Sequence, residues 1–325
     1  MRSFFIATAI AAAGLMPMPA SAQDGDNDFG VLVMAHGGGE TWNGEVREML
    51  RPVDDDYPLE IAFGMADAVS LQAAVGRLEA RGAERIGVVR LFVSGESWYE
   101  RTREILGVDT GAPARPEPEH HEMDGMDEEG GDHGMSMEYW RIDTDAAFAL
   151  SQEGLAEAPE MGEVLVERAR ELSEAPSSES VLILAHGPGD DAENRRWIEW
   201  IDARADTVRD AIPFREVRVE TLREDWPDAR EVAQARIRGF VAEASEGEGR
   251  AIVIPYRVQG FGPYADVLDG LDYVASGQGL LPSVEVEHWV RRQIDDMQAG
   301  EFETPLAEAV HAAAPVEDRM HMSHR

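Results

Sequence analysis

One short pattern occurs twice in the chain, with its two histidines 150 positions apart. The first copy reads Val31-Leu-Val-Met-Ala-His36-Gly-Gly-Gly39 and the second reads Val181-Leu-Ile-Leu-Ala-His186-Gly-Pro-Gly189. An apolar run of this length that ends at glycine is typical of a buried parallel strand. Open α/β sheets bind their ligands at the carboxyl ends of such strands, which is where both histidines stand. The repeat therefore predicts two similar domains, each with one imidazole at its ligand-binding edge.

Short apolar runs alternate with stretches of helical periodicity in both halves of the chain. The expected strands cover residues 31–35, 59–63, 86–93, 139–142, 181–185, 217–222, 251–254 and 284–287. The expected helices cover residues 41–50, 68–80, 159–173, 192–210, 228–243 and 288–297. Such alternation is typical of parallel βαβ units. We therefore predict an α/β fold of two tandem flavodoxin-like domains, each a parallel sheet flanked by helices, over residues 28–175 and 178–298.

The first 22 residues have the pattern of an export signal. Arg2 supplies the positive charge, residues 4–15 the apolar core, and Ala20-Ser-Ala22 the small residues of a cleavage site. The apolar core is too short to span a bilayer. The chain contains no cysteine, which excludes a lipoprotein anchor, disulfides and thiolate metal sites. We therefore expect an exported, periplasmic protein with no membrane span.

The net charge of the chain is −35, and all 29 of its basic residues are arginine. Such a surface repels nucleic acid and anionic membranes, so neither is an expected partner. The same charge concentrates divalent cations near the protein, although a general adaptation for solubility or salt is the simpler explanation. We expect a monomer whose two halves form an internal pseudo-dimer, and no nucleotide cofactor.

The two strand-end histidines are the first candidates for chemistry. A neutral imidazole at such a position can bind a divalent metal or accept a proton. Gly37, Gly38 and Gly187 follow the histidines and would let a ligand approach the backbone closely. The alternative is that His36 and His186 merely cap their loops through hydrogen bonds.

A second landmark is the loop after the later strand of each half. The first reads Arg90-Leu-Phe-Val-Ser-Gly-Glu-Ser-Trp-Tyr-Glu100 and the second Pro255-Tyr-Arg-Val-Gln-Gly-Phe-Gly-Pro-Tyr264. Because parallel strands end at the same edge of a sheet, these loops should lie beside the histidines. Glu96 is then a possible partner of His36, and Arg257 could meet an acidic ligand.

A strand that ends in Ala-His-Gly, followed about sixty residues later by Leu-Phe-Val-Ser-Gly, resembles the class II, ATP-independent tetrapyrrole chelatases. The resemblance is to the sirohydrochlorin cobaltochelatase and ferrochelatase family in its long form with two fused halves, and it covers most of residues 30–295. It implies a chelatase-like fold and insertion of Co(II), Fe(II) or Ni(II) into a tetrapyrrole in a cleft between the halves. It also implies that His36 and, by the repeat, His186 hold the metal. The family's second histidine has no match, because Ser97 and Gly262 stand at its positions.

Residues 108–137 lack periodicity, and residues 299–325 follow the last expected helix; both segments are expected to be mobile. The first contains His120, His121 and His133 among methionines and carboxylates. Imidazole with thioether suits copper, and imidazole with carboxylate suits nickel, cobalt or zinc. These histidines are therefore candidate metal ligands, unless the segment is simply a disordered acidic loop.

Two other functions compete with metal insertion. An esterase would use His36-Gly-Gly-Gly39 as an oxyanion loop and Gly95-Glu-Ser97 as a nucleophile elbow, but Tyr99 stands where the elbow needs a second glycine. A histidine phosphatase would need arginine before His-Gly, where both copies have alanine. A non-catalytic periplasmic protein that binds metal or tetrapyrrole on the same scaffold accounts for the missing second histidine and stays open as the alternative.

Overall fold

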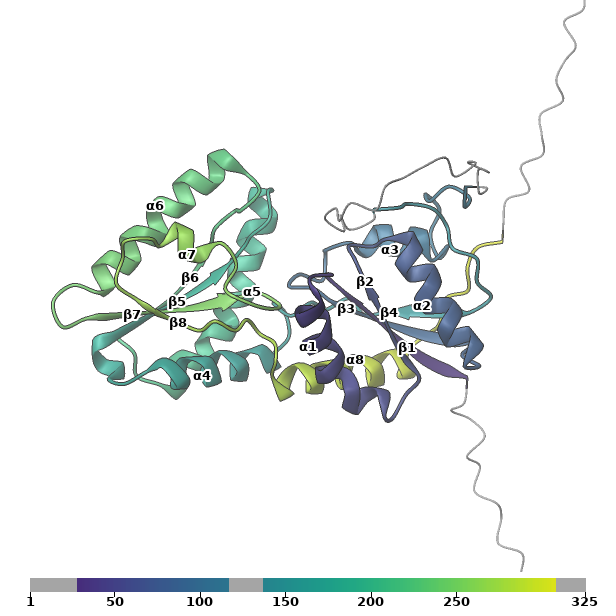
Figure 1. Ribbon diagram of the computed structural model, residues 1–325, viewed down its shortest axis with the longest axis horizontal. Coiled ribbons are helices and arrows are strands. Elements are labelled where there is room, and N and C mark those ends of the chain that lie inside the picture. Colours follow the sequence, from purple (N-terminus) through teal and green to yellow (C-terminus); the bar gives the residue numbers. More distant parts are fainter. Residues whose placement is uncertain (1–27, 117–136, 308–325) are drawn as a thin grey trace, which may run out of the picture.

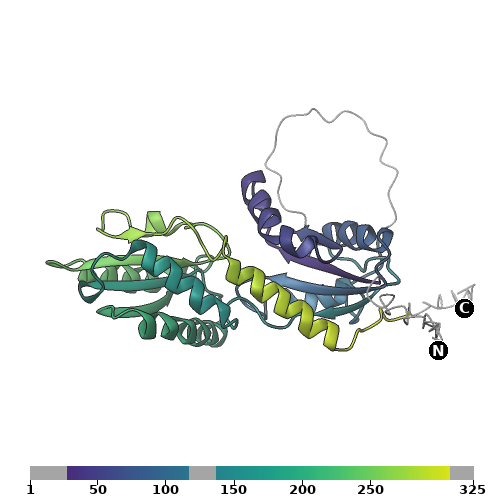
Figure 2. The same cartoon turned by 90° about the horizontal axis from the view of Figure 1, so that it is seen from below.

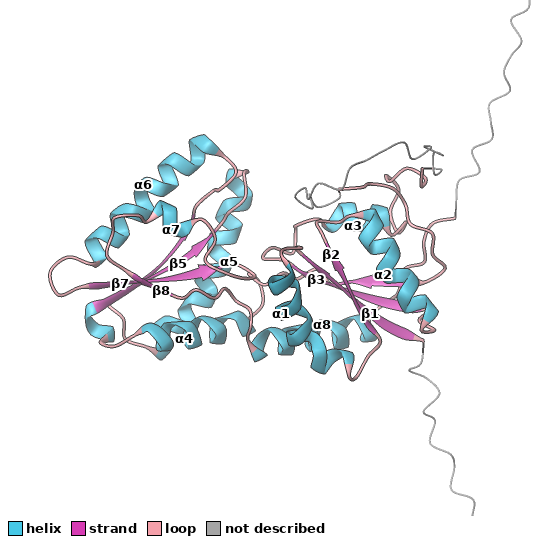
Figure 3. Cartoon of the chain, viewed as in Figure 1, coloured by secondary structure: helices cyan, strands magenta, loops and turns pink. Residues whose placement is uncertain are grey.

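The computed structural model describes residues 28–116 and 137–307 and contains two parallel sheets of four strands each (Figures 1 and 3). The strands are β1 (Phe29–Ala35), β2 (Leu59–Phe63), β3 (Arg85–Leu91), β4 (Ala147–Leu150), β5 (Glu179–Ala185), β6 (Glu216–Thr221), β7 (Arg250–Tyr256) and β8 (Val274–Ala275). The helices are α1 (Glu40–Asp54), α2 (Ala68–Ala80), α3 (Tyr99–Ile105), α4 (Glu160–Leu172), α5 (Asp191–Ala211), α6 (Pro227–Ala244), α7 (Tyr264–Val267) and α8 (Val284–Ala299), with a 3₁₀ turn at Pro176–Ser178. The predicted α/β architecture of two sheets flanked by helices is confirmed.

Both sheets have the same strand order. It is β2-β1-β3-β4 in the first and β6-β5-β7-β8 in the second, and every pair of neighbouring strands is parallel. The chain leaves β1 outward to β2 and then returns across β1 to β3, so the direction of winding reverses between β1 and β3. The same reversal separates β5 from β7. Such reversal points open a crevice at the carboxyl ends of the two strands.

The last helix of each half is exchanged between the two sheets. Helix α4 comes from the first half of the chain but packs on α5 and β7, whereas α8 comes from the second half and packs on α1, β3 and β4. Figure 2 shows α8 lying along the first sheet. The predicted boundary between residues 175 and 178 therefore separates the strands of the two sheets but not their helices, because helical periodicity carries no information about which sheet a helix covers.

The exchange joins the two halves through one hydrophobic core. The largest cluster of buried side chains contains residues of both sheets, such as Val31 and Val181, together with Met161 of α4 and Trp289 of α8. Two smaller clusters cover the opposite faces of the sheets under α2 and α6. Burial of apolar area is the main stabilising contribution in such a core, so the halves stabilise each other.

Two of the expected strands are wrong. Residues 139–142 form no strand, although Trp140 and Ile142 are buried, and the fourth strand of the first sheet is β4 at Ala147–Leu150. Residues 284–287 are the first turn of α8, where Ser283 caps the helix by accepting the backbone N–H of Glu285 at 3.3 Å. Alternating Val and Glu indicated a strand there, but the buried positions of α8 follow helical spacing.

The expected mobile segments are in part ordered. Glu303 exchanges two backbone hydrogen bonds of 2.8 Å with Phe148 of β4, and its carboxylate pairs with Arg103 at 2.7 Å. Val108 is buried at the start of the expected insertion. Residues 117–136 and 308–325, and the candidate export signal, lie outside the described residues. No helix in the described part of the chain is long and apolar enough to cross a membrane.

Candidate functional site

Both histidines of the repeat lie where two parallel strands end side by side. Ala35 pairs with Leu91, so His36 follows β1 at the edge where β3 ends. Ala185 pairs with Tyr256 in the same way, so His186 lies at the edge where β7 ends. Each histidine therefore stands at the carboxyl end of its strand, as the sequence predicted, and the strand order makes this position the reversal point of the sheet.

A cavity of about 680 Å³ is lined by residues of both halves, including both histidines. The first half contributes His36, Trp42, Met65, Phe92, Val93, Ser97 and Trp98. The second half contributes His186, Gly187, Pro188, Gly189, Glu193, Trp197, Glu224, Asp225, Trp226, Arg257, Val258 and Gln259. Residues that are 150 positions apart in the sequence thus share one cavity.

His36 is exposed and has one ring nitrogen committed. Its Nδ1 lies 2.8 Å from the carbonyl oxygen of Gly37. A carbonyl oxygen only accepts hydrogen bonds, so Nδ1 carries the proton and Nε2 of the neutral ring keeps a free lone pair. The ring meets Trp42 edge to face, with the centroids 6.5 Å apart. This arrangement leaves Nε2 as the atom able to bind a metal or accept a proton.

His186 lies deeper in the protein than His36. Its ring meets the buried Trp197 edge to face at a centroid distance of 4.8 Å. Burial lowers the pKa of His186 to about 4, with smaller contributions from the positive charges of Arg257 and His36. His186 is therefore neutral at ordinary pH, which is the form that binds metals and accepts protons.

The glycines after the histidines make room for neighbouring side chains. Gly187 has a φ of +74°, and a Cβ there would lie 2.6 Å from the Cβ of Thr221. A Cβ on Gly189 would lie within 2.3 Å of the indole of Trp226, and one on Gly38 would lie 3.1 Å from Trp42. Gly187 lines the cavity, whereas Gly37 and Gly38 do not belong to its lining.

Two charged side chains of the later loops are already paired. Glu96 was predicted to be a partner of His36, but its carboxylate binds Arg196 of α5 through two hydrogen bonds of 2.8 and 2.6 Å. Glu96 lies outside the lining of the cavity. Arg257 does line the cavity, and its Nη1 lies 2.5 Å from Oε1 of Glu224. Glu96 could therefore act on His36, and Arg257 on an acidic ligand, only in competition with these ion pairs.

Glu193 and Glu224 are cavity carboxylates that the sequence reasoning did not single out. Burial raises the pKa of Glu224, although Arg257 opposes the effect. Burial also raises the pKa of Glu193, with a further contribution from the charge of Glu96. Glu224 follows β6 at the same edge of the sheet as His186, so the rule that located the histidines could also have found it.

The loop that carries Ser97 and Trp98 is held by a buried arginine. Arg90 is 1% exposed, and its guanidinium donates to the carbonyl oxygens of Ser97 at 2.8 Å and Gly95 at 2.7 Å. It also donates to Ser151 at 3.0 Å. Trp98 has a left-handed φ of 61°, an uncommon conformation for a bulky residue. Arg90 thus compensates for a strained turn that places Trp98 in the cavity wall.

The remaining metal candidates are not assembled. His120, His121 and His133 lie outside the described residues. Within residues 28–116 and 137–307, no group of three or more His, Cys, Asp or Glu side chains is arranged to hold a metal ion. The two strand-end imidazoles therefore form at most part of a coordination sphere.

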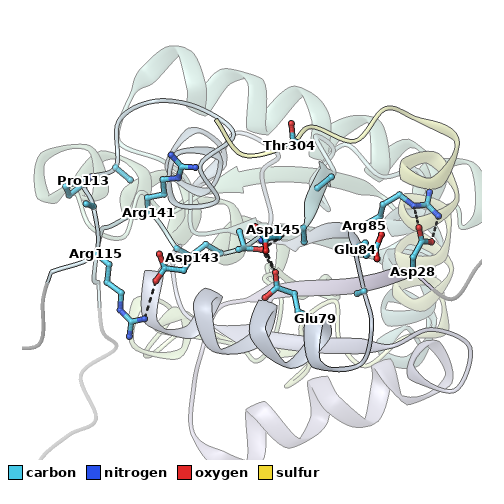
Figure 4. A pocket seen from close by; sticks show the side chains of 17 residues that line it. Asp28, Glu79, Glu84, Arg85, Pro113, Arg115, Arg141, Asp143, Asp145 and Thr304 are labelled. Carbon is cyan, nitrogen blue, oxygen red and sulfur yellow. Dashed lines mark hydrogen bonds and ion pairs between the residues drawn. The ribbon is translucent and has the colours of Figure 1, made fainter. Parts of the chain in front are cut away.

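A larger cavity, of about 1740 Å³, lies at the opposite edge of the first sheet, near the starts of β3 and β4 (Figure 4). Its charged side chains pair with one another, as in Arg85 with Asp28 at 2.8 Å and Arg115 with Asp143 at 3.7 Å. It contains no histidine. The smaller cavity at the carboxyl ends of the strands therefore remains the candidate site.

Comparisons with known proteins agree with the fold. No protein-family model matches the chain, and no curated protein sequence does so. Among solved structures, SirB from Bacillus subtilis with Fe3+ is 14% identical, with a TM-score of 0.57, and the match covers 85% of this chain and 99% of SirB. The sirohydrochlorin chelatase SirB from Bacillus subtilis subspecies spizizenii in complex with cobalt gives the same identity and coverage, with a TM-score of 0.52.

A third structure is longer than this chain. DR2241 from Deinococcus radiodurans, described as structurally similar to chelatases, is 16% identical with a TM-score of 0.49, and the match covers 82% of this chain. The chain spans 55% of the length of DR2241. The matches to SirB confirm that the two halves of this chain have the α/β fold of a sirohydrochlorin chelatase.

Proposed function

We propose that this protein binds a divalent metal ion and a tetrapyrrole in the cavity between its halves and inserts the metal into the macrocycle. The observation that carries the proposal is that His36 and His186, the two histidines of the repeat, line one cavity. The likeness in fold to SirB, which was solved with Fe3+ and with cobalt, supports the same class of substrate. Cobalt, iron and nickel are the metals we propose, with sirohydrochlorin or a related tetrapyrrole as the acceptor.

The chemistry follows from the side chains of the cavity. When a divalent metal enters a tetrapyrrole, four metal–nitrogen bonds form and two pyrrole protons leave. Nε2 of His36 and the neutral ring of His186 present lone pairs to the metal. Glu193 and Glu224, whose pKa values are raised by burial, are placed to accept the protons. The metal is a substrate here, so its remaining ligands come from the macrocycle.

One observation favours a second candidate, a protein that binds the metal or the tetrapyrrole without turnover. Ser97 lines the cavity where the chelatase family carries its second histidine. The described residues also offer no set of three metal ligands. A binding protein would use the same cavity but would not insert the metal. The two candidates therefore differ in whether the protein catalyses a reaction, and not in the location of the site.

A chelation assay separates the two candidates. Sirohydrochlorin is mixed with Co(II), Ni(II) or Fe(II) and the mature protein, and the absorbance change is compared with a control without protein. We expect acceleration that disappears in His36→Ala and persists in His288→Ala, a matched control because His288 is an exposed histidine on α8 outside the cavity. Tight binding without acceleration would favour the binding protein. Neither acceleration nor binding would refute both.

We also propose that the protein is exported to the periplasm, on the basis of the export signal expected in residues 1–22. Cell fractionation and N-terminal sequencing test this proposal. The expected result is a periplasmic protein that has lost these residues, and a cytoplasmic protein with an intact N-terminus would refute it.

A further inference from the structure

The charged side chains of the cavity are mostly acidic. They are Glu193, Glu224, Asp225 and Arg257. Arg257 is engaged, because its Nη1 lies 2.5 Å from Glu224 and its guanidinium carbon lies 5.6 Å from the centre of the Tyr264 ring. Ligand carboxylates are usually bound by arginine or lysine side chains with free donors. Along the described lining, this cavity has no cation without such an acidic partner.

The uncharged part of the lining is rich in tryptophan. Four of the seven tryptophans of the chain line this one cavity, namely Trp42, Trp98, Trp197 and Trp226. Trp226 is 39% exposed, although its indole is large and apolar. Indole faces stack on flat rings and attract cations placed over them. The wall is therefore suited to a flat aromatic ligand, and its π faces favour positive charge over negative charge.

The net charge of −35 adds a long-range field that repels polyanions.

From these contacts we infer that the cavity selects a flat macrocycle that is neutral or positively charged, and discriminates against macrocycles that carry many carboxylates. This inference rests on the proposed function, since it names which tetrapyrroles the proposed site accepts. Within the proposed function, it predicts that a tetrapyrrole with few carboxylates is a better substrate than sirohydrochlorin, which is rich in carboxylates.

Two porphyrins of similar size and opposite charge test the inference. The probes are meso-tetrakis(N-methylpyridinium-4-yl)porphyrin and meso-tetrakis(4-carboxyphenyl)porphyrin, and binding to the full-length protein is followed by quenching of tryptophan fluorescence at neutral pH. We expect the cationic porphyrin to bind at least about tenfold more tightly at low salt, with a gap that narrows as salt is added. Equal affinity, or tighter binding of the carboxylate porphyrin, would overturn the inference.

A pair of matched variants distinguishes the cavity from the general negative surface. Glu193→Gln, Asp225→Asn and Glu224→Gln together remove three negative charges from the cavity. Glu243→Gln, Glu246→Gln and Glu248→Gln remove three from an exposed region at the end of α6. We expect the cavity variant to lose most of the preference for the cationic porphyrin and the surface variant to keep it. If both variants keep it, the preference belongs to the surface and the inference fails.

The single variant Asp225→Asn provides a second test if the cavity variant does not fold, because Asp225 is exposed. We expect it to reduce the preference by a few-fold. An unchanged preference would count against the inference. Failure of the proposed function is recognised separately, by metal binding that is unaffected when both histidines are replaced, or by a protein that binds neither porphyrin.

Discussion

The two strand-end loops share one sequence pattern but differ in the contacts that fix them. The loop after β1 leaves His36 exposed, and its backbone is tied by the N–H of Gly38, which donates to Oδ1 of Asn43 at 3.1 Å. The loop after β5 places His186 beside the buried Trp197, and the N–H of Arg223 donates to the carbonyl of His186 at 2.6 Å. A repeat in sequence therefore does not imply two equal environments.

These environments suit the two imidazoles to different tasks. His186 is a neutral, positioned ligand whose protonation is suppressed by burial. His36 is exposed to solvent and its Nε2 is free. A histidine that is the first to bind a metal ion arriving from solvent needs both properties.

Arg90→Ala should lower the free energy of unfolding by about 3–5 kcal/mol, because it leaves a strained turn and several buried carbonyl oxygens without donors. The second half has Pro255 and no arginine at the corresponding position of β7. Chemical denaturation measures the effect. Arg51→Ala, which removes an arginine whose side chain is 69% exposed, should change stability by less than about 0.5 kcal/mol. Equal effects of the two variants would contradict the role of Arg90.

Gly187→Ala should cost about 2–4 kcal/mol of stability, since alanine would have to adopt a positive φ and would clash with Thr221. A control change in the loop after β1, Gly39→Ala, meets no atom within 4 Å and should cost less than about 1 kcal/mol. Thermal or chemical unfolding of the two variants gives the comparison. A larger loss of stability in Gly39→Ala than in Gly187→Ala would contradict the claim that the loop after β5 is the more tightly packed of the two.

The low pKa of His186 should make stability depend on pH. The unfolded chain binds a proton at this residue below about 6.5 and the folded protein only below about 4, so the unfolded state holds more protons between these values. Stability is then complete above pH 6.5 and falls as the pH drops toward 4, by about 3 kcal/mol in total from this residue. The slope should be reduced in His186→Gln, and NMR titration should find an imidazole pKa near 4. An unchanged slope would show that other groups cause the pH dependence.

The ion pair of Glu96 and Arg196 joins the two halves at the surface, where each side chain is 43% exposed. A double-mutant cycle with Glu96→Gln and Arg196→Gln should give only a weak coupling, and high salt should reduce it further. A coupling as large as the loss of stability in Gly187→Ala would mean that the pair, and not the shared core, holds the halves together.

Most of the fold could be predicted from the sequence because its strands are continuous apolar runs. β1, β5 and both histidines were located by their repeat, and parallel pairing then placed each histidine beside a later loop. The fourth strand of the first sheet was missed because Trp140 and Ile142 are as apolar as a strand, yet they are buried without pairing. The exchange of α4 and α8 was missed because it depends on tertiary packing, which local periodicity does not record.

The site could be predicted only in part. His36, His186 and Arg257 do line one cavity. Glu96 does not line it, and its carboxylate instead binds Arg196 of the other half. No pattern along the chain signals a contact between residues a hundred positions apart. The tryptophans of the cavity were missed for a related reason, because single aromatic residues on helices and loops are most often core residues.

A double-mutant cycle on Co(II) binding, in the presence of a bound tetrapyrrole, tests whether His36 and His186 act at one shared site. Affinity is measured by titration for the wild type, His36→Ala, His186→Ala and the double variant. If the two imidazoles share one metal ion, each single change should remove most of the affinity and the double change should remove little more. Losses that simply add would show two independent sites, and unchanged affinity in all three variants would show that the metal binds elsewhere.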